Sequence, residues 1–255
     1  MASSPQFLLF SLLLISISLS HAKTSFRPHA LVLPVSKDAS TLQYLTHFNQ
    51  RTPLLSISLV VDLGGQFLWV DCEQGYVSSS YLPAQCHSAQ CSLARDSGWC
   101  NNTTCILLPD NPITSTGTDG ELTQVSVSRL LFSCGSTFLL GGLASGVKGM
   151  AGLGRNPIGL PSQFAAAFSF HRKFAVCLSS STTSNGVIFL GDGPYVMLPN
   201  VDVSQSLIYT PLFINPVSTA GAYLTGEPSV EYFIGVKSIV ECVIAINRWR
   251  GLRRN

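Results

Sequence analysis

The chain has 255 residues, of which 46% are hydrophobic and 11% are charged, and its formal net charge is only +2. A chain of this length can bury one sizeable core. So small a net charge argues against a nucleic-acid partner, which would require a strongly basic surface.

The first 22 residues have the features of a secretory signal peptide. An apolar and serine-rich run from Phe7 to Leu19 precedes the small-residue cleavage sequence Ser20-His21-Ala22. The run is too short to span a membrane, and no later segment is a better candidate. We therefore expect a secreted, extracellular protein that begins near Lys23 and has no membrane anchor in its mature form.

The next feature is an aspartate between two apolar segments. Strands are expected at 54–61 and 67–70, and Asp62-Leu63-Gly64 lies in the connection. Aspartic proteases place a catalytic carboxylate on such a loop, with Thr or Ser after the Asp. Leu63 occupies that position here. No second Asp-Thr-Gly or Asp-Ser-Gly follows an apolar segment, since the one Asp-Ser-Gly elsewhere, Asp96-Ser97-Gly98, lies among the cysteines. Trp69 alternates within the second segment and is expected in the core.

Both departures matter chemically. Aspartic proteolysis uses two facing carboxylates that share one proton. One of them accepts a proton from the attacking water while the other polarises the peptide carbonyl. The Thr or Ser hydroxyl braces the two loops, and leucine has no donor to offer. Asp62 and Gly64 are interpreted as a vestige, and no intact catalytic site is expected. Taken alone, the tripeptide also fits an ordinary turn.

Cysteines follow in a dense group, five of them between Cys72 and Cys105. In a secreted chain this density favours disulfides. Zinc ribbons use two-residue spacers, whereas Cys86/Cys91 and Cys100/Cys105 have four-residue spacers and no histidine cluster accompanies them. No metal or other cofactor is expected, and the spacing leaves the pairing open. The disulfide candidates are Cys72, Cys86, Cys91, Cys100, Cys105, Cys134 and Cys177, and the eighth cysteine is Cys242.

Two overlapping glycosylation sequons lie within this region. Asn101 and Asn102 each begin an Asn-x-Thr sequence, and we expect one of them to carry a glycan. The same residues would also suit a polar loop without a glycan.

The rest of the chain reads as short strands separated by turns. Strands are expected at 129–134, 187–190, 208–213 and 232–237, with turn signals such as Asn185-Gly186 between them. One helix is expected at 162–168, with Pro161 at or just before its first turn. The glycine-rich run at 141–146 lacks the features of a phosphate-binding loop. These elements predict an all-β fold of the barrel or sandwich type.

Seven segments together resemble a plant family of pepsin-like proteins. Its members include xylanase inhibitors, glucanase-inhibitor-type proteins, extracellular dermal glycoproteins and basic seven-S globulins. The matches lie in order over roughly residues 28 to 239. They are DLGGQFLWVDC (62–72), CHSAQC (86–91), GVKGMAGLGR (146–155), LPSQF (160–164), FAVCL (174–178), FLGDGPY (189–195) and EYFIGVK (231–237).

The resemblance implies a pepsin-like β-barrel lobe, with two such lobes facing a cleft in complete members. It assigns residues 23–200 to the N-terminal lobe, 201–239 to the start of the C-terminal lobe, and 240–255 to a divergent tail. In the inhibitor branch, the resemblance implies a degenerate first motif and a partner that is a cell-wall-degrading glycosidase. The segment 111–122 looks like the family's flap hairpin, but it lacks the tyrosine that active proteases use there.

The ending differs most from the family pattern. After Ile239 the family would continue into its second lobe, so we interpret this chain as truncated rather than as having a divergent natural end. The resemblance also implies that Cys177 has its partner in the second lobe. Cys242 would then either replace that partner or leave two free thiols.

Three functions follow from these observations. The first is a secreted, catalytically degenerate protein that binds and inhibits a microbial xylanase or glucanase. The second is an aspartic endopeptidase that pairs Asp62 with another Asp, against which Leu63 and the missing flap tyrosine argue. The third is a seed or cell-wall glycoprotein without specific activity.

Overall fold

The computed structural model describes residues 28–94, 98–125, 130–197, 199–217 and 228–236. The expected signal peptide (1–22), the divergent tail (240–255) and Cys242 therefore lie outside the described residues. The same holds for Arg129 and Lys237, at the ends of two expected strands.

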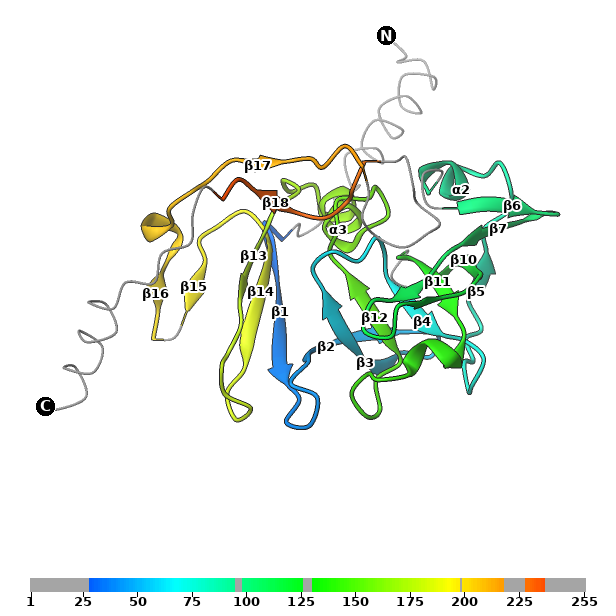
Figure 1. Ribbon diagram of the computed structural model, residues 1–255, viewed down its shortest axis with the longest axis horizontal. Helices are drawn as coiled ribbons and strands as arrows, with labels where there is room; N and C mark the ends of the chain where they lie inside the picture. Colours follow the sequence, from blue (N-terminus) through cyan, green and yellow to red (C-terminus); the bar gives the residue numbers. More distant parts are fainter. Residues whose placement is uncertain (1–27, 95–97, 126–129, 198, 218–227, 237–255) are drawn as a thin grey trace, which may run out of the picture.

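Short β-strands make up most of the described chain (Figure 1). The helical elements are α2 (Ala89–Leu93), η2 (Thr137–Leu140), α3 (Leu160–Phe168) and η3 (Ser204–Ser206). The strands are β1 (Ala30–Lys37), β2 (Tyr44–Gln50), β3 (Leu55–Asp62), β4 (Trp69–Asp71), β5 (Tyr81–Pro83), β6 (Gly98–Asn101), β7 (Thr104–Leu107), β8 (Asp110–Asn111), β9 (Thr116–Gly117), β10 (Gly120–Val125), β11 (Leu131–Gly135), β12 (Gly149–Gly152), β13 (Phe174–Cys177), β14 (Gly186–Gly191), β15 (Val196–Met197), β16 (Val201–Asp202), β17 (Leu212–Phe213) and β18 (Phe233–Ile234).

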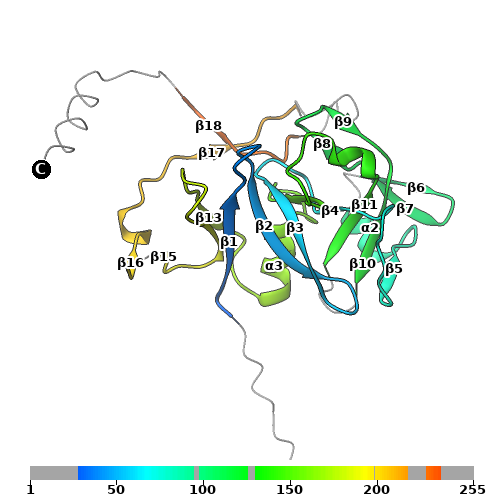
Figure 2. The ribbon, with the colours of Figure 1, turned by 90° about the horizontal axis from the view of Figure 1, so that it is seen from below.

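A 12-stranded mixed sheet organises the fold, in the order β13-β14-β1-β2-β3-β12-β4-β11-β10-β7-β6, with β5 beside β10. Two neighbouring pairs, β3–β12 and β4–β11, are parallel. The β15–β16 hairpin and the β5–β7 region lie at opposite ends of the molecule (Figure 2). This mainly β architecture with one large sheet confirms the broad fold class predicted from the sequence.

The core follows from side-chain alternation on the central strands. Met150 of β12 is in register with both Val60 and Trp69, and all three side chains are buried in one cluster. Their neighbours Leu59 and Val70 point to the opposite face and are buried in a second cluster. Successive side chains in a strand face opposite sides, so the central strands bury apolar residues on both faces. Trp69 is 3% exposed, and its expected place in the core is confirmed.

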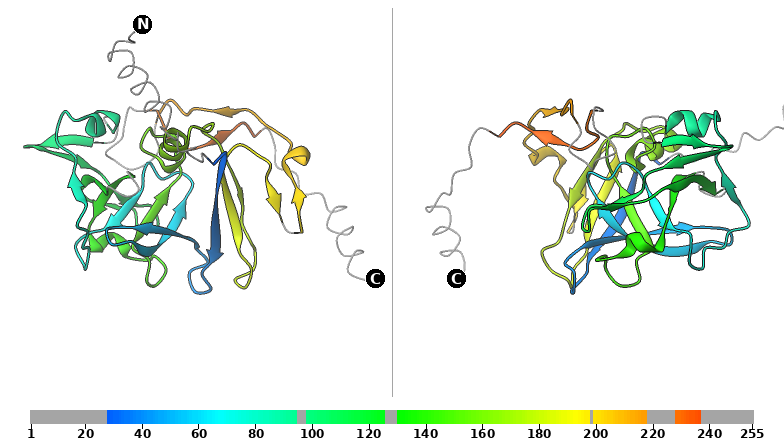
Figure 3. Two further views of the ribbon diagram at one scale, coloured as in Figure 1. Left: turned by 180° about the vertical axis from the view of Figure 1, so that it is seen from behind. Right: turned by 45° about the vertical axis from the view of Figure 1, so that its right-hand side comes forward.

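The polypeptide after β16 returns across the molecule. Strand β17 pairs with β18, and residues 228–236, which we call the C-terminal strap, run past the ends of β13 and β14 (Figure 3). The strap brings residues of the late sequence next to the loop after β3.

Three disulfides join six of the candidate cysteines: Cys72–Cys134, Cys86–Cys100 and Cys91–Cys105. The last two link the α2 region to the β6–β7 hairpin. Cys177 lies on β13, half-buried, and forms no disulfide with any cysteine of the described ranges.

Several expected elements agree with the structure. Strand β3 and strand β14 each lie within one residue of their predicted ends, and helix α3 has its proline in the first turn, beginning two residues earlier than expected. The strand expected at 208–213 is wrong over its first part, because only Leu212–Phe213 forms a strand. Ile208 is 99% exposed and has no strand beside it. No helix among the described residues is long and apolar enough to cross a membrane.

Candidate functional site

The loop after β3 crosses the end of β12, because β12 lies between β3 and β4 in the sheet. Asp62 is the last residue of β3 and is in register with Gly152 of β12. Its carbonyl oxygen accepts a hydrogen bond from the backbone N–H of Leu153 at 2.8 Å. Its carboxylate accepts one from the N–H of Gly64 at 3.0 Å. Asp62 is thus held rigidly at the entrance of the loop.

Gly65 permits this close crossing. A Cβ atom at this position would lie 2.8 Å from Oδ2 of Asp62 and 3.0 Å from the Cα atom of Gly152. Any side chain would therefore push the Asp62 carboxylate and strand β12 apart. The two glycines thus let the loop pack closely against Asp62 and strand β12.

Leu63 points outward from the same loop. Its residue surface is 45% exposed, and its side chain lines a pocket instead of contacting a second polar loop. An isobutyl group supplies no hydrogen bond, so the brace expected of Thr or Ser is missing.

Two further carboxylates lie near Asp62. Asp110 begins strand β8 of the flap hairpin, whose base is held by Asn111. The buried Asn111 amide donates to the carbonyl oxygens of Leu139 and Gly141 at 2.8 Å each. Glu231 of the strap lies against Gly64, where an added Cβ atom would be 3.1 Å from its Cγ. Its carboxylate accepts a hydrogen bond from the hydroxyl of Ser229 at 3.0 Å.

These surroundings favour the protonated forms of Asp62 and Asp110. Burial raises the pKa of Asp62, the N–H groups of Gly64 and Gly65 oppose the rise, and the charge of Glu231 adds to it. Burial and the negative charge of Asp62 raise the pKa of Asp110 to about 6. Part of Asp110 is nevertheless exposed, and solvent there weakens the interaction. The site therefore holds interacting acids, but no braced pair of facing catalytic loops.

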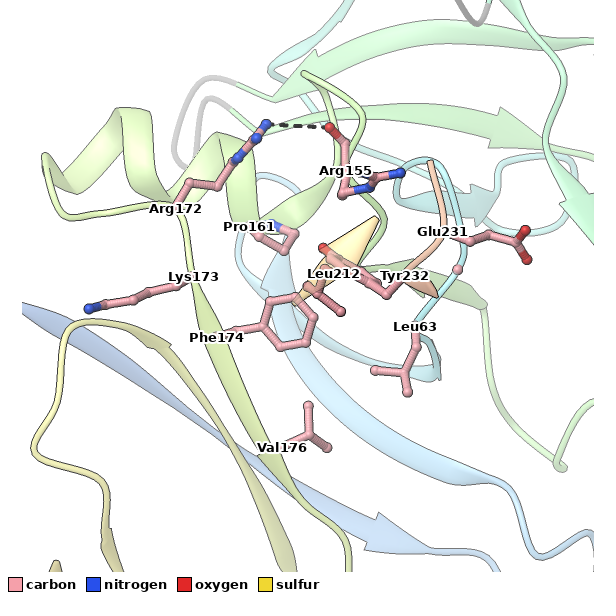
Figure 4. Close-up of a pocket in the computed structure, with 11 residues that line it drawn as sticks. Leu63, Arg155, Pro161, Arg172, Lys173, Phe174, Val176, Leu212, Glu231 and Tyr232 are labelled. Carbon is pink, nitrogen blue, oxygen red and sulfur yellow. Dashed lines mark hydrogen bonds between the residues drawn. The ribbon is translucent and has the colours of Figure 1, made fainter. Parts of the chain in front are cut away.

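A pocket of about 660 Å³ opens beside the loop (Figure 4). Leu63, Phe174, Val176 and Leu212 give it apolar walls, while Arg155 and Arg172 lie along one rim. Within the described residues, no group of three or more His, Cys, Asp or Glu side chains is arranged to hold a metal ion.

The strap is fixed to this pocket by polar and aromatic contacts. The backbone N–H of Arg155 donates to the carbonyl of Val230 at 2.8 Å, and its Nη2 donates to that of Ser229 at 2.7 Å. The hydroxyl of Tyr232 donates to the carbonyl of Leu153 at 2.8 Å, and its ring meets Phe174 edge to face at 5.5 Å. Residues from three distant parts of the sequence thus form one wall.

The expected glycosylation sites lie on the opposite end of the sheet from the strap. Asn101 ends β6, and Asn102 has a φ of 54° in the turn before β7. Both are exposed and therefore accessible.

Sequence reasoning did not single out Asp110, Arg155, Arg172 or Glu231 as site residues. Arg155 and Glu231 appeared only within family-like segments, and Asp110 immediately precedes the segment interpreted as a flap. No local pattern marks these four residues, since only the tertiary fold brings them to the Asp62 loop.

Comparisons with known proteins show the family of this chain. The xylanase inhibitor N-terminal family matches residues 44–192. A relative from Nicotiana benthamiana, "Probable aspartic proteinase GIP2", is 60% identical over 94% of this chain and 62% of its own length. The chain therefore spans less than two thirds of that relative.

Solved structures give the same result. The crystal structure of edgp is 56% identical, with a TM-score of 0.79 over 85% of this chain and 59% of that one. The crystal structure of Basic 7S globulin from soybean is 38% identical, with a TM-score of 0.67 over 76% of this chain and 57% of that one. The chain belongs to the xylanase inhibitor N-terminal family of pepsin-like proteins, together with edgp and the basic 7S globulins.

Proposed function

We propose that this chain is a secreted, catalytically degenerate aspartic-protease-like protein that binds and inhibits a cell-wall-degrading glycoside hydrolase. A xylanase or a glucanase is the partner that the sequence resemblance implies. The observation that carries the proposal is the Asp62 loop. Asp62 is held at the end of β3 by the N–H groups of Gly64 and Leu153, while Leu63 stands where a proteolytic site requires a hydroxyl.

The domain assignment belongs to the same proposal. Residues 23–200 would form the N-terminal lobe of a pepsin-like barrel, and 201–239 the start of a second lobe. The strap supports this division, because it belongs to the second segment and docks against the first lobe through the contacts of Arg155 and Tyr232. The three disulfides support secretion, and the exposure of Asn101 and Asn102 supports a glycan on one of them.

The test is an inhibition assay with the full chain secreted from eukaryotic cells. Xylanase and glucanase are each incubated with increasing protein, and the release of reducing sugar is measured. The proposal predicts a saturable loss of activity of one enzyme, together with a complex on size-exclusion chromatography. Undiminished activity of every xylanase and glucanase tested, without a complex, would refute it.

Proteolysis of the glycosidase would imitate inhibition, so the assay needs a second readout. Under inhibition by binding, the glycosidase remains a single intact band on a denaturing gel and regains activity on dilution. Cleavage would give fragments that accumulate with time, and Asp62→Asn would abolish them.

The second candidate is an aspartic endopeptidase. It is favoured by the acids beside Asp62 and by the raised pKa of Asp110. Under this alternative, the chain would digest a denatured protein in acid, and a pepstatin-like ligand would block the digestion. Because Leu63 replaces the bracing hydroxyl, we expect neither the digestion nor its inhibition to occur.

A further inference from the structure

The pocket beside Leu63 has an uneven distribution of charge. Arg155 and Arg172 lie next to one another, since Nη1 of Arg172 donates to the carbonyl oxygen of Arg155 at 3.4 Å. Both residues line the pocket together with Tyr232. Two positive groups thus face one cavity.

Neither guanidinium group forms an ion pair with a carboxylate of the described residues. Among the described residues, the side chain of Arg155 donates to the carbonyl of Ser229, and its Nε is buried without an acceptor. Arg172 makes only long contacts of 3.4 and 3.5 Å. Guanidinium groups form their strongest hydrogen bonds with carboxylates. Arg155 and Arg172 therefore have N–H donors that could still bind a carboxylate.

The other charged side chains of the pocket are directed elsewhere. Lys173 is bound to Asp192 at 2.6 Å and extends away from the cavity (Figure 4). The carboxylate of Glu231 lies at the far side from Arg172 and is bound to Ser229. The remaining wall is apolar, with Leu63, Phe174 and Val176 facing the cavity.

We propose that this pocket binds a small organic carboxylate. The carboxylate would bind at Arg155 and Arg172, and its apolar body would lie against Leu63, Phe174 and Val176. The cavity of about 660 Å³ has room for a short aliphatic or aromatic molecule. This inference goes beyond the proposed function, because it involves neither a glycosidase nor catalysis by Asp62.

The experiment measures binding of four probes to the full secreted chain by isothermal titration calorimetry at neutral pH. Octanoate and 3-phenylpropanoate carry the charged head, and octan-1-ol and 3-phenylpropan-1-ol carry the same bodies without charge. At least one acid should bind at one site about tenfold more tightly than its alcohol, the effect of one charge-assisted hydrogen bond. Which acid binds better identifies the apolar body as aliphatic or aromatic.

Variants separate the two parts of the site. Arg172 is exposed, so Arg172→Gln should leave the fold intact and weaken the acid about tenfold without affecting the alcohol. Leu63→Ser should weaken acid and alcohol alike, because it shortens the apolar wall. Lys37→Gln removes the same charge from the end of β1, which does not line the pocket, and should change nothing. Arg155→Gln should resemble Arg172→Gln, with the unfolding temperature recorded because Arg155 also anchors the strap.

Three results would overturn the inference. The first is no saturable binding of either acid. The second is equal affinity for acid and alcohol, which would mean a nonspecific apolar cavity. The third is binding that occurs only as a dimer dissociates on size-exclusion chromatography, which would make the pocket an interface between copies. None of these results bears on whether the chain inhibits a glycosidase.

Discussion

Replacing Asp110 with asparagine should stabilise the protein at neutral pH and have no effect in acid. The pKa of Asp110 is raised from 3.8 to about 6 by burial and by the charge of Asp62. The folded protein therefore binds more protons than the unfolded chain between these values, and its stability falls as the pH rises through them. Asparagine cannot ionise, so Asp110→Asn removes this loss.

The magnitude follows from the shift and from the exposure of the residue. A rise of about two pKa units corresponds to roughly 3 kcal/mol at 1.36 kcal/mol per unit. Asp110 is partly exposed, however, so solvent screening reduces the effect. We expect a gain of about 1 kcal/mol at neutral pH, which raises the unfolding temperature by about 2–4 °C for a domain of this size.

Thermal unfolding followed by circular dichroism at about pH 3.5 and about pH 7, at constant ionic strength, measures this gain. Asp119→Asn is the matched control, since Asp119 is an exposed acid before β10 and its replacement removes the same charge. The reasoning is refuted if the unfolding temperatures of Asp110→Asn and the wild type differ by the same amount at both pH values. It is also refuted if Asp119→Asn raises the unfolding temperature as much as Asp110→Asn does.

Three other changes test the packing around the site. Phe132→Ala should lower the free energy of unfolding by about 3–5 kcal/mol, because Phe132 is fully buried between strands. A denaturant titration measures this loss, and a loss below about 1 kcal/mol would contradict the assigned core. Removing Cys72–Cys134, which closes a loop of 62 residues, should cost about 4 kcal/mol against about 3 for either disulfide that closes 14 residues. The comparison is made by paired Ala variants, and the opposite order would rule out loop entropy as the cause. Tyr232→Phe should make the strap more susceptible to limited proteolysis while changing the global unfolding free energy by only about 1 kcal/mol. Equal protease resistance would show that its hydrogen bond does not hold the strap.

The sequence could predict β3, β4 and β14, because each is an apolar run. The central strand β12 was not predicted, because glycine at both of its ends leaves no apolar run. Strand β3 and helix α3 carry strong local signals, an apolar run and a proline in the first turn. Strand β1, by contrast, was not predicted, because its partly exposed pattern becomes a strand only by pairing with β14. Residues 208–211 show the reverse case, in which an apolar pattern has no strand to pair with.

The candidate site likewise has a part that the sequence predicts and a part that it does not. Asp62 and Gly64 could be found because the loop and its flanking strands are continuous in sequence. The rim formed by Arg155 and Arg172, and the approach of Glu231, depend on where the strap docks. The pairing of the cysteines likewise depends on the meeting of α2 with the β6–β7 hairpin. Long-range contacts of this kind leave no periodic signal in the chain.

The position of β1 in the sheet has a consequence for how the protein is made. Ala30 is in register with Gly191, which follows it by 161 residues. At about 5–20 residues per second, roughly 8–30 s pass between the synthesis of the two strands. During this time one edge of β1 is unpaired, because its partner β14 has not yet been made. Strands so distant in sequence also pair slowly. The sheet is therefore closed by a late segment of the chain, and a ribosome that stalls before Gly191 would leave an open strand edge prone to aggregation.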